Sequence, residues 1–305
     1  MYRVREQIGC TDAIMSKANA VCNIAILDTG IAVHPDLKDH ILDFQDFINH
    51  KTGIYDEKGH GTHVCGIACG SGKLSGGRYK GIAPGAGILV GKVLDYNGNG
   101  SVFHMIDGID WVIKNKNRFS IRVLNISVGL GGSMSERKEK ILLEKLMEAV
   151  ESGIIVVCAA GNTGPAVNTI SNIGRCKDFL TVGCHDGLYF KKKSGRCETY
   201  SARGGEHDKY IKPDLVAPGT DIISCNNRII RSRGTYIDAY IKKSGTSMAA
   251  PIVSGAIALI LQCCPDWDNK TVVRKVLLSA EDLKEPLNKQ GYGMINVKKV
   301  LTGLV

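Results

Sequence analysis

Short apolar runs alternate with helical patterns along most of this 305-residue chain. The apolar runs are residues 21–27, 88–94, 122–126, 154–158 and 179–183. The helical patterns are residues 61–70, 101–114, 135–152, 252–261 and 270–280. Runs that are apolar almost throughout are typical of parallel strands buried on both faces. Their alternation with helices predicts an α/β fold, with a mostly parallel central sheet and helices on both faces.

The heptapeptide Gly245–Pro251 stands directly before the most apolar helical pattern, residues 252–261. Ser247 would lie at or near the start of that helix, where unpaired backbone N–H groups and the helix dipole favour negative charge. A serine placed there can attack a carbonyl while its own N–H stabilises the oxyanion. A helix-capping serine is the alternative, and for this segment taken alone it is the better interpretation.

Two further segments supply the groups that a nucleophilic serine requires. Asp28 follows the first apolar run, at the carboxyl end of a strand, where open α/β sheets form their sites. His60 and His63 lie at the start of the small-residue helix 61–70. A neutral imidazole takes the serine proton, and a carboxylate fixes its tautomer and stabilises the imidazolium. Asp, His and Ser occur in that order along the chain.

These motifs resemble those of the subtilisin family of serine proteases, and its intracellular bacterial members in particular. Asp28 lies in Asp-Thr-Gly, His60 begins His-Gly-Thr-His-Val, and Ser247 lies in Gly-Thr-Ser-Met-Ala-Ala-Pro. A fourth match, Ala-Ala-Gly-Asn, ends at Asn162. The resemblance covers residues 21–261 and implies the subtilisin-like three-layer sandwich. It also implies a catalytic triad of Asp28, His60 and Ser247, with Asn162 donating its side-chain amide to the oxyanion.

The resemblance separates other polar residues from the triad. It implies that His63 packs and hydrogen-bonds inside its helix. Asp36 matches a position that helps to bind a structural calcium in many relatives. The loop that takes the place of the other ligands, residues 70–80, has no carboxylate but carries two lysines and an arginine, whereas calcium requires several oxygen ligands. We therefore expect no metal among the site residues and no cofactor in the chemistry, with a structural Ca²⁺ as the alternative.

By the same resemblance, the substrate binds as an extended strand between two edges of the site, since main-chain pairing gives affinity in such complexes. One edge is residues 99–101, for which an ordinary turn is the alternative. The other edge is residues 127–129, and the primary specificity pocket lies between it and residues 159–161. The residues expected to bind substrate are Gly100, Ser127, Val128, Gly129, Ala159, Ala160, Gly161 and Thr163.

The side chains around the primary pocket predict its preference. Thr163 and Ser171 are expected near its rim and floor, and no carboxylate is apparent in it. We therefore expect cleavage after large uncharged residues such as Leu, Phe, Tyr or Met. A second pocket, formed by Val102, Met105 and Val128, is expected to favour an apolar residue three positions upstream of that one.

Composition is consistent with a single peptidase domain over residues 1–305, without a recognisable long prodomain. Hydrophobic residues make up 44% of the chain and 36 positions are glycine. No stretch reaches the roughly 18 uninterrupted apolar residues of a membrane helix, and residues 1–8 lack the apolar core of a signal peptide. Eleven cysteines without an export signal fit a reducing compartment. Cys65 and Cys69 lack a second pair with zinc spacing. We expect a cytoplasmic protein with no membrane partner.

The charge adds one expectation about substrates. The chain has 39 Lys+Arg against 30 Asp+Glu, a net charge of +9. Some of this excess lies just before the Ser247 motif, in a loop with Arg228, Arg231 and Arg233, and at Lys242 and Lys243. A cationic wall there would attract acidic residues downstream of the cut; a solvated basic loop is the alternative. Nucleic acid is not an expected partner, because no aromatic or recognition-helix pattern accompanies the charges.

Three classes of function are compared on these grounds. The first is a serine endopeptidase that hydrolyses protein or peptide substrates through an acyl-enzyme. The second is a catalytically silent relative that only binds peptides, but no triad residue is lost. The third is a lipase-type hydrolase, which expects Gly-x-Ser-x-Gly and the order Ser, Asp, His, whereas Ser247 is followed by Met-Ala. We expect the first class, and no oligomeric state is predicted.

Overall fold

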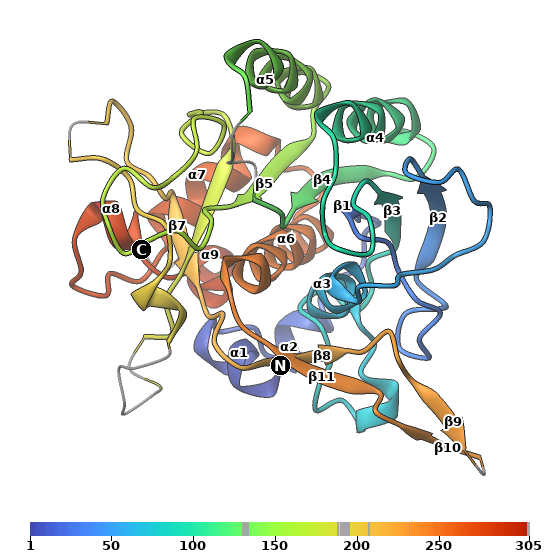
Figure 1. Ribbon diagram of the computed structural model, residues 1–305. Helices are drawn as coiled ribbons and strands as arrows, with labels where there is room; N and C mark the ends of the chain where they lie inside the picture. Colours follow the sequence, from blue (N-terminus) through green and yellow to red (C-terminus); the bar gives the residue numbers. More distant parts are fainter. Residues whose placement is uncertain (130–133, 188, 190–195, 207, 233, 304–305) are drawn as a thin grey trace.

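A parallel sheet forms the centre of the computed structural model, which describes residues 1–129, 134–187, 189, 196–206, 208–232 and 234–303. Within these residues its seven strands follow the order β2-β3-β1-β4-β5-β6-β7 (Figure 1), and each pairs with its neighbours in parallel. The strands are β1 (Asn23–Asp28), β2 (Ile41–Asp46), β3 (Ile88–Lys92), β4 (Ile121–Ile126), β5 (Ile155–Ala159), β6 (Leu180–Cys184) and β7 (Leu215–Ala217). Every residue of β1 and β3 is buried, as their unbroken apolar runs predict.

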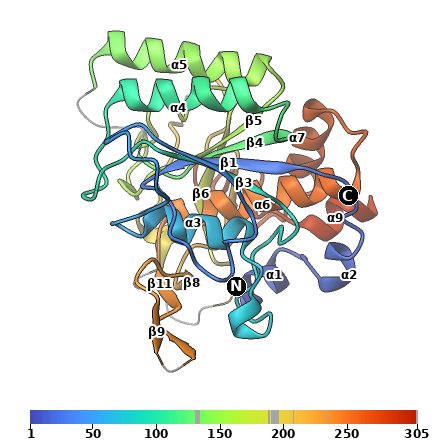
Figure 2. The same ribbon diagram turned by 90° about the vertical axis from the view of Figure 1, so that its right-hand side faces the viewer.

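Helices cover both faces of the sheet, so the predicted three-layer α/β sandwich is confirmed. Figure 2 shows α4 (Val102–Asn115) and α5 (Glu136–Glu151) stacked on one side. On the other side lie α3 (His60–Cys69) and α6 (Thr246–Cys263). The other helical elements of the described residues are α1 (Tyr2–Gln7), α2 (Asp12–Met15), α7 (Asn269–Leu278), α8 (Leu287–Gln290), α9 (Val297–Thr302) and the 3₁₀ turns Lys73–Ser75 and Cys197–Thr199.

The long apolar helix α6 lies in the core of the protein. By length and composition it could cross a membrane, with a mean hydropathy of 1.6, yet 89% of it is buried inside the fold. It packs on α3 and on β4, β5 and β6. It also contacts α7 and α9. Because the sheet covers one side of α6 and other helices cover the rest, the helix is apolar all round. Its start at Thr246 sets Ser247 in the first helical turn.

A small antiparallel unit lies beside α3. Strands β8 (Ile222–Cys225) and β11 (Tyr240–Lys243) pair with each other. Between them, β9 (Ile230–Ser232) and β10 (Thr235–Ile237) form a hairpin that projects from the body of the protein (Figure 2). The sequence interpretation of this segment as a loop was wrong, because Ile230–Ser232 pairs in antiparallel register with Thr235–Ile237.

The cysteines also differ in part from expectation. Nine are free, and six of these are buried. Cys184, which ends β6, is joined by a disulfide to Cys197, 13 positions farther along the chain. This disulfide was not predicted, because only the three-dimensional structure brings the two Cα atoms to 5.7 Å. The disulfide differs from the expectation that all eleven cysteines are free thiols.

Candidate active site

Asp28 and His60 meet at the carboxyl end of β1. Asp28 is the last residue of the strand and is fully buried. Its Oδ1 lies 2.7 Å from His60 Nδ1 and accepts a second bond of 2.7 Å from the Thr29 N–H. His60 is the first residue of α3. A Cβ on Gly61 would clash with the Gly30 carbonyl oxygen, so only glycine lets α3 begin this close to β1.

The environment of His60 acts on its pKa in two directions. Burial lowers the pKa of the imidazole, but the charge and hydrogen bond of Asp28 outweigh this, so the pKa of His60 lies above its usual value of 6.5. Lys243 acts against Asp28 and lowers the pKa of His60. The Asp28 contact to Nδ1 fixes the ring so that Nε2 is left to exchange a proton.

Asp56 holds the start of α3, and the sequence analysis missed it. Its buried carboxylate accepts four hydrogen bonds of 2.6–2.9 Å: from the Thr29 hydroxyl, the Gly59 N–H, and both the N–H and the hydroxyl of Thr62. The Thr29 hydroxyl in turn accepts from the Gly61 N–H at 2.9 Å. An acidic residue four positions before His60, at a predicted helix start, is the sequence signal that could have identified it.

Helix α6 brings Ser247 and Asn162 to neighbouring positions. Gly245 precedes the helix with a φ of 143°. The Thr246 N–H and hydroxyl both donate to Asn162 Oδ1, at 3.0 and 3.1 Å. Because two donors face this oxygen, the Asn162 amide nitrogen is the atom that remains to donate. The Thr246 hydroxyl also accepts from the Gly161 N–H at 3.2 Å, so it joins α6 to the segment after β5.

The groups expected to react have hydrogen-bonding atoms that are not engaged by other described residues. Within the described residues, neither the Ser247 hydroxyl nor its N–H has a hydrogen-bond partner, and His60 Nε2 has none. Catalytic hydrogen bonds are often long before substrate binds. Asp28 ends β1, Asn162 follows β5, and β4 lies between these two strands. The four sequence-predicted residues therefore gather over one edge of the sheet.

His63 is held away from this chemistry. It is fully buried, and its Nε2 donates to the carbonyls of Ile222 and Ile241, both at 3.1 Å. Burial lowers the pKa of His63 from 6.5 to about 3, so the ring is neutral. These contacts fasten β8 and β11 to α3, which agrees with the packing role that the sequence resemblance implies.

The predicted substrate edges differ in how open they are. Gly129 is exposed, and a Cβ added there would meet no atom within 4 Å in the part of the chain that the structure describes. Gly100 differs, because its Cβ would clash with the Val93 carbonyl oxygen. Internal packing alone therefore requires glycine at position 100, and the expected contact of this residue with substrate stays a prediction. The Ser127 side chain is buried and accepts from Asn125 Nδ2 at 2.8 Å.

The predicted pocket segment is tied to its neighbours through its backbone. The Ala160 N–H donates to Val182, and the Gly161 carbonyl accepts from Ala202, both at 2.9 Å. Ala159 is partly buried, and Thr163 is exposed with its hydroxyl donating to the Thr169 carbonyl. Ser171 accepts from the Gly174 N–H.

The second predicted pocket is less open than expected. Met105 packs in the core beneath α4, and Val102 and Val128 are partly buried against the same core.

A separate cavity of about 920 Å³ lies at the opposite edge of the sheet. Residues near the starts of β4, β5 and β6 line it together with α7, including Arg122, Ile155, Leu180 and Arg274. None of the sequence-predicted site residues borders it. The cavity thus lies at the amino ends of these strands, whereas Asp28 and Asn162 lie at or beyond the carboxyl ends of β1 and β5.

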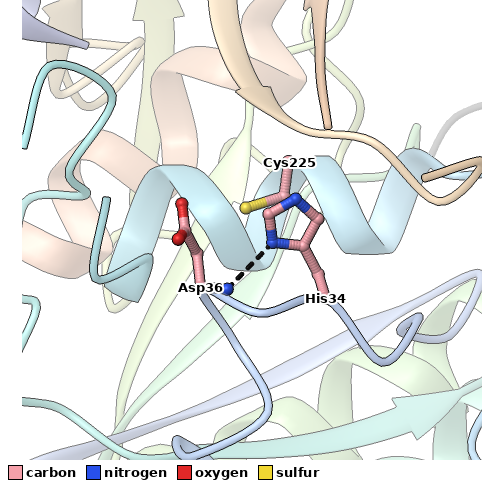
Figure 3. Close-up of side chains that lie close together, drawn as sticks. All are labelled: His34, Asp36 and Cys225. Atoms are coloured by element: carbon pink, nitrogen blue, oxygen red, sulfur yellow. Dashed lines mark hydrogen bonds between the residues drawn. The ribbon is translucent and has the colours of Figure 1, made fainter. Parts of the chain in front are cut away.

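The surroundings of Asp36 do not fit a calcium ion. Its carboxylate already accepts from the Tyr240 hydroxyl at 2.6 Å and the Leu74 N–H at 2.9 Å. Figure 3 shows His34 and Cys225 beside it, which are not the oxygen ligands that calcium prefers. Both nitrogens of His34 are engaged, because Nδ1 accepts from the Asp36 N–H and Nε2 faces the Ala239 carbonyl.

Comparison with known proteins agrees with this geometry. The model of the Subtilase family matches residues 21–294. Serine protease AprX of Bacillus subtilis (strain 168) is 37% identical over 297 residues, which cover 92% of this chain and 66% of AprX. Subtilisin Savinase of Lederbergia lenta is 32% identical over 276 residues, covering 90% of this chain and 88% of Savinase. The chain thus spans about two thirds of the length of AprX. On the family match and these identities, the chain belongs to the subtilase family.

Proposed function

We propose that this protein is a serine endopeptidase that cleaves protein or peptide substrates through an acyl-enzyme. Ser247 attacks the scissile carbonyl, His60 takes the serine proton and passes it to the leaving amine, and Asp28 orients His60. The Asn162 amide and the Ser247 N–H stabilise the oxyanion. The observation that carries the proposal is the open start of α6. There Thr246 occupies the Asn162 Oδ1 and leaves the amide nitrogen to donate, and the next residue, Ser247, has an N–H without a partner among the described residues.

A fluorophosphonate probe tests this proposal directly. We expect stoichiometric labelling of the wild-type protein and none of Ser247→Ala, with casein hydrolysed by the former only. A simple lipid ester should be a poor substrate for both proteins. A labelled protein that leaves casein intact, or labelling that persists in Ser247→Ala, would overturn the assignment.

The substrate preference is a finer part of the same proposal. We propose that the peptide lies extended along residues 99–101 and 127–129, and that large uncharged residues precede the cut. Gly129 supports this, since no atom of the described residues lies within 4 Å of a Cβ added there. A peptide library should give Leu, Phe, Tyr or Met at that position, and a profile dominated by Arg or Lys would contradict it.

We further propose that the enzyme acts in the cytoplasm and that its activity needs no calcium at Asp36. The buried free thiols and the hydrogen bonds that already fill the Asp36 carboxylate support these two points. Chelation with EGTA should change neither activity nor melting temperature. Rapid alkylation of the protein in its own cells should find the nine free cysteines reduced, and widespread oxidation among them would argue for another compartment.

A further inference from the structure

The cavity at the amino ends of β4, β5 and β6 has an apolar lining that is mostly aliphatic. Its volume of about 920 Å³ falls within the roughly 300–1,000 Å³ of small-molecule sites. Ile155 and Leu180, at the first positions of β5 and β6, line it. On α7, Val273 and Leu277 are four residues apart and share one helix face, and Leu278 beside them is 51% exposed. An apolar ligand here would therefore remove exposed aliphatic surface from water.

Basic side chains border the same cavity. The cationic lining residues are Lys116, Arg122, Lys177, Lys270 and Arg274. Within the described residues, Lys177, Lys270 and Arg274 form no ion pair, and Lys116 donates to a neutral group, the Ser152 carbonyl. These cations are therefore not neutralised by the described part of the protein.

The carboxylates that line the cavity are fewer than the cations. Asp214 Oδ2 is engaged by Lys212 Nζ at 2.6 Å. Asp268 Oδ1 accepts from the Thr271 N–H at 2.7 Å and so caps the start of α7. The third lining carboxylate, Asp178, is exposed. The described lining thus carries an excess of positive charge, which attracts an anion.

Arg122 is the cation whose side chain is held in place by printed contacts on both sides of the cavity. It is half-buried near the start of β4, and its Nη2 donates to the Trp267 carbonyl at 3.0 Å and to Asn269 Oδ1 at 2.6 Å. Its Nε and Nη1 have no acceptor among the described residues, and neither is sealed from solvent. A guanidinium that is already ordered can donate charge-assisted bonds to an anion at little further cost in side-chain entropy.

We propose that this cavity binds an organic anion in which a carboxylate is joined to an aliphatic chain, as in a fatty acid. The carboxylate accepts from Arg122, and the chain covers Leu278 and the aliphatic face of α7. A flat aromatic ligand fits less well, because Phe179 and Tyr292 are the only aromatic side chains among the described lining residues and Phe179 is buried. The inference goes beyond the proposed peptidase function, since none of the residues assigned to catalysis borders the cavity.

Four small probes test the site by isothermal titration calorimetry of the whole protein. Octanoate should bind one to one with a Kd below about 1 mM, as expected for a ligand of its size. 1-Octanol keeps the chain but lacks the charge, and should bind about tenfold more weakly. Octylammonium should not bind measurably, because cations border the cavity. Acetate should not bind either, because it lacks the chain.

Variants assign the binding to this cavity. Arg122→Gln removes the guanidinium and should weaken octanoate binding about tenfold. Arg274→Gln, at an exposed position of α7, should weaken it about two- to threefold, the range for an exposed charge. Leu278→Glu puts a like charge on the exposed apolar rim and should also weaken binding. The matched control is Arg137→Gln on α5, because Arg137 is exposed and does not line the cavity, and this variant should keep the Kd.

Several results would overturn the site. Octanoate that does not saturate at millimolar concentration, or 1-octanol that binds as tightly as octanoate, would mean that no anion site exists here. An equal loss in Arg137→Gln and Arg122→Gln would mean that octanoate responds only to the net charge of the protein. Arg122 also joins β4 to the start of α7, so Arg122→Gln could fail to fold. In that case an unchanged Kd in both Arg274→Gln and Leu278→Glu would overturn the assignment.

The outcome of this test is independent of the proposed peptidase function. Ser247→Ala should bind octanoate with the same Kd as the wild-type protein, because Ser247 is not among the residues that line the cavity. A protein that binds octanoate but is not labelled by the fluorophosphonate would contradict the peptidase proposal alone. A labelled, casein-cleaving protein that does not bind octanoate would contradict the cavity proposal alone.

Discussion

The two helices that carry the candidate triad begin in similar ways but are completed differently. α3 begins at His60 after Gly59, and α6 places Ser247 second after Gly245, with neither glycine able to provide a side-chain cap. At α3 the Gly59, Gly61 and Thr62 N–H groups all have acceptors, two of them from the Asp56 carboxylate. At α6 the Ser247 N–H has no partner among the described residues.

The difference shows that the N-terminus of a helix can serve two purposes. The start of a helix attracts negative charge. α3 has a permanent anion, Asp56, and is thereby fixed as a rigid support for His60. No described anion binds the start of α6, and under the proposed mechanism its N-terminal groups serve the oxyanion that exists only during the reaction. A permanent anion thus stabilises the start of the first helix, whereas the start of the second is proposed to bind the transition state.

The largest expected effect comes from removing Ser247, the proposed nucleophile in the first turn of α6. Ser247→Ala should lower kcat by several orders of magnitude, the scale known for subtilisin itself. Because triad residues act as a unit, the double variant Ser247→Ala/His60→Ala should be scarcely slower than either single variant. Steady-state kinetics with a peptide substrate measures this. Losses that multiply in the double variant would mean that the two residues act independently.

The oxyanion donors at α6 should give the next largest effect. Asn162→Ala should lower kcat about 10²–10³-fold with little change in KM, the range established for the oxyanion asparagine of subtilisin. Thr246→Val keeps Asn162 but removes one donor to its Oδ1, and should lower kcat about two- to tenfold, as expected for one hydrogen bond. If Thr246→Val leaves kcat unchanged, the orientation of Asn162 does not depend on that hydroxyl.

At the start of α3 the expected effect is a loss in the free energy of unfolding of the protein. Asp56→Asn replaces one accepting oxygen by an NH₂ group that cannot accept, so at least one buried donor is left without its bond. The free energy of unfolding should fall by about 1–3 kcal/mol, measured by urea denaturation. Asp39→Asn, at an exposed side chain, is the control and should change it by less than about 0.5 kcal/mol. If the two substitutions lower the free energy of unfolding equally, Asp56 has no special role at the start of α3, and the contrast between α3 and α6 is wrong.

The smallest expected effect is a shift in pH dependence. His60 acts as base only when neutral, so kcat/KM should rise with pH through a pKa above 6.5. Lys243 lowers the pKa of His60. Lys243→Met should therefore move the acid limb of the profile to higher pH, whereas Lys242→Met should move it less. A shift to lower pH in Lys243→Met would contradict the electrostatic contact between β11 and α3.

The sequence could predict the residues that stand in short contiguous motifs, but not those whose contacts join distant segments of the chain. Asp28, His60, Asn162 and Ser247 stand in short motifs at the ends of apolar runs, and the structure places them at one edge of the sheet. Thr246 was not assigned a role, since its bonds to Asn162 join segments 84 residues apart. A contact of that kind has no periodicity or composition that a sequence pattern could reveal.

The fold shows the same division. Strands buried on both faces were predictable from unbroken apolar runs. β2 lies at the edge of the sheet, with a mixed burial pattern, and β7 has only three residues, so neither gives such a run. The predicted helix 252–261 is longer in the structure, where it spans Thr246–Cys263 and includes the Thr-Ser of the motif in its first turn.

The β9–β10 hairpin has a consequence for the diversification of this enzyme. Its base is closed by bonds from Asn226 to Ala239 and Asp238, while β10 is wholly exposed and β9 nearly so. Doubling the length of a surface loop costs only about 0.6 kcal/mol. Insertions or replacements at this tip therefore leave β11, Lys243 and the start of α6 in place. The sequence of the hairpin, and with it any recognition of partners there, can therefore change while the proposed catalytic residues stay in place.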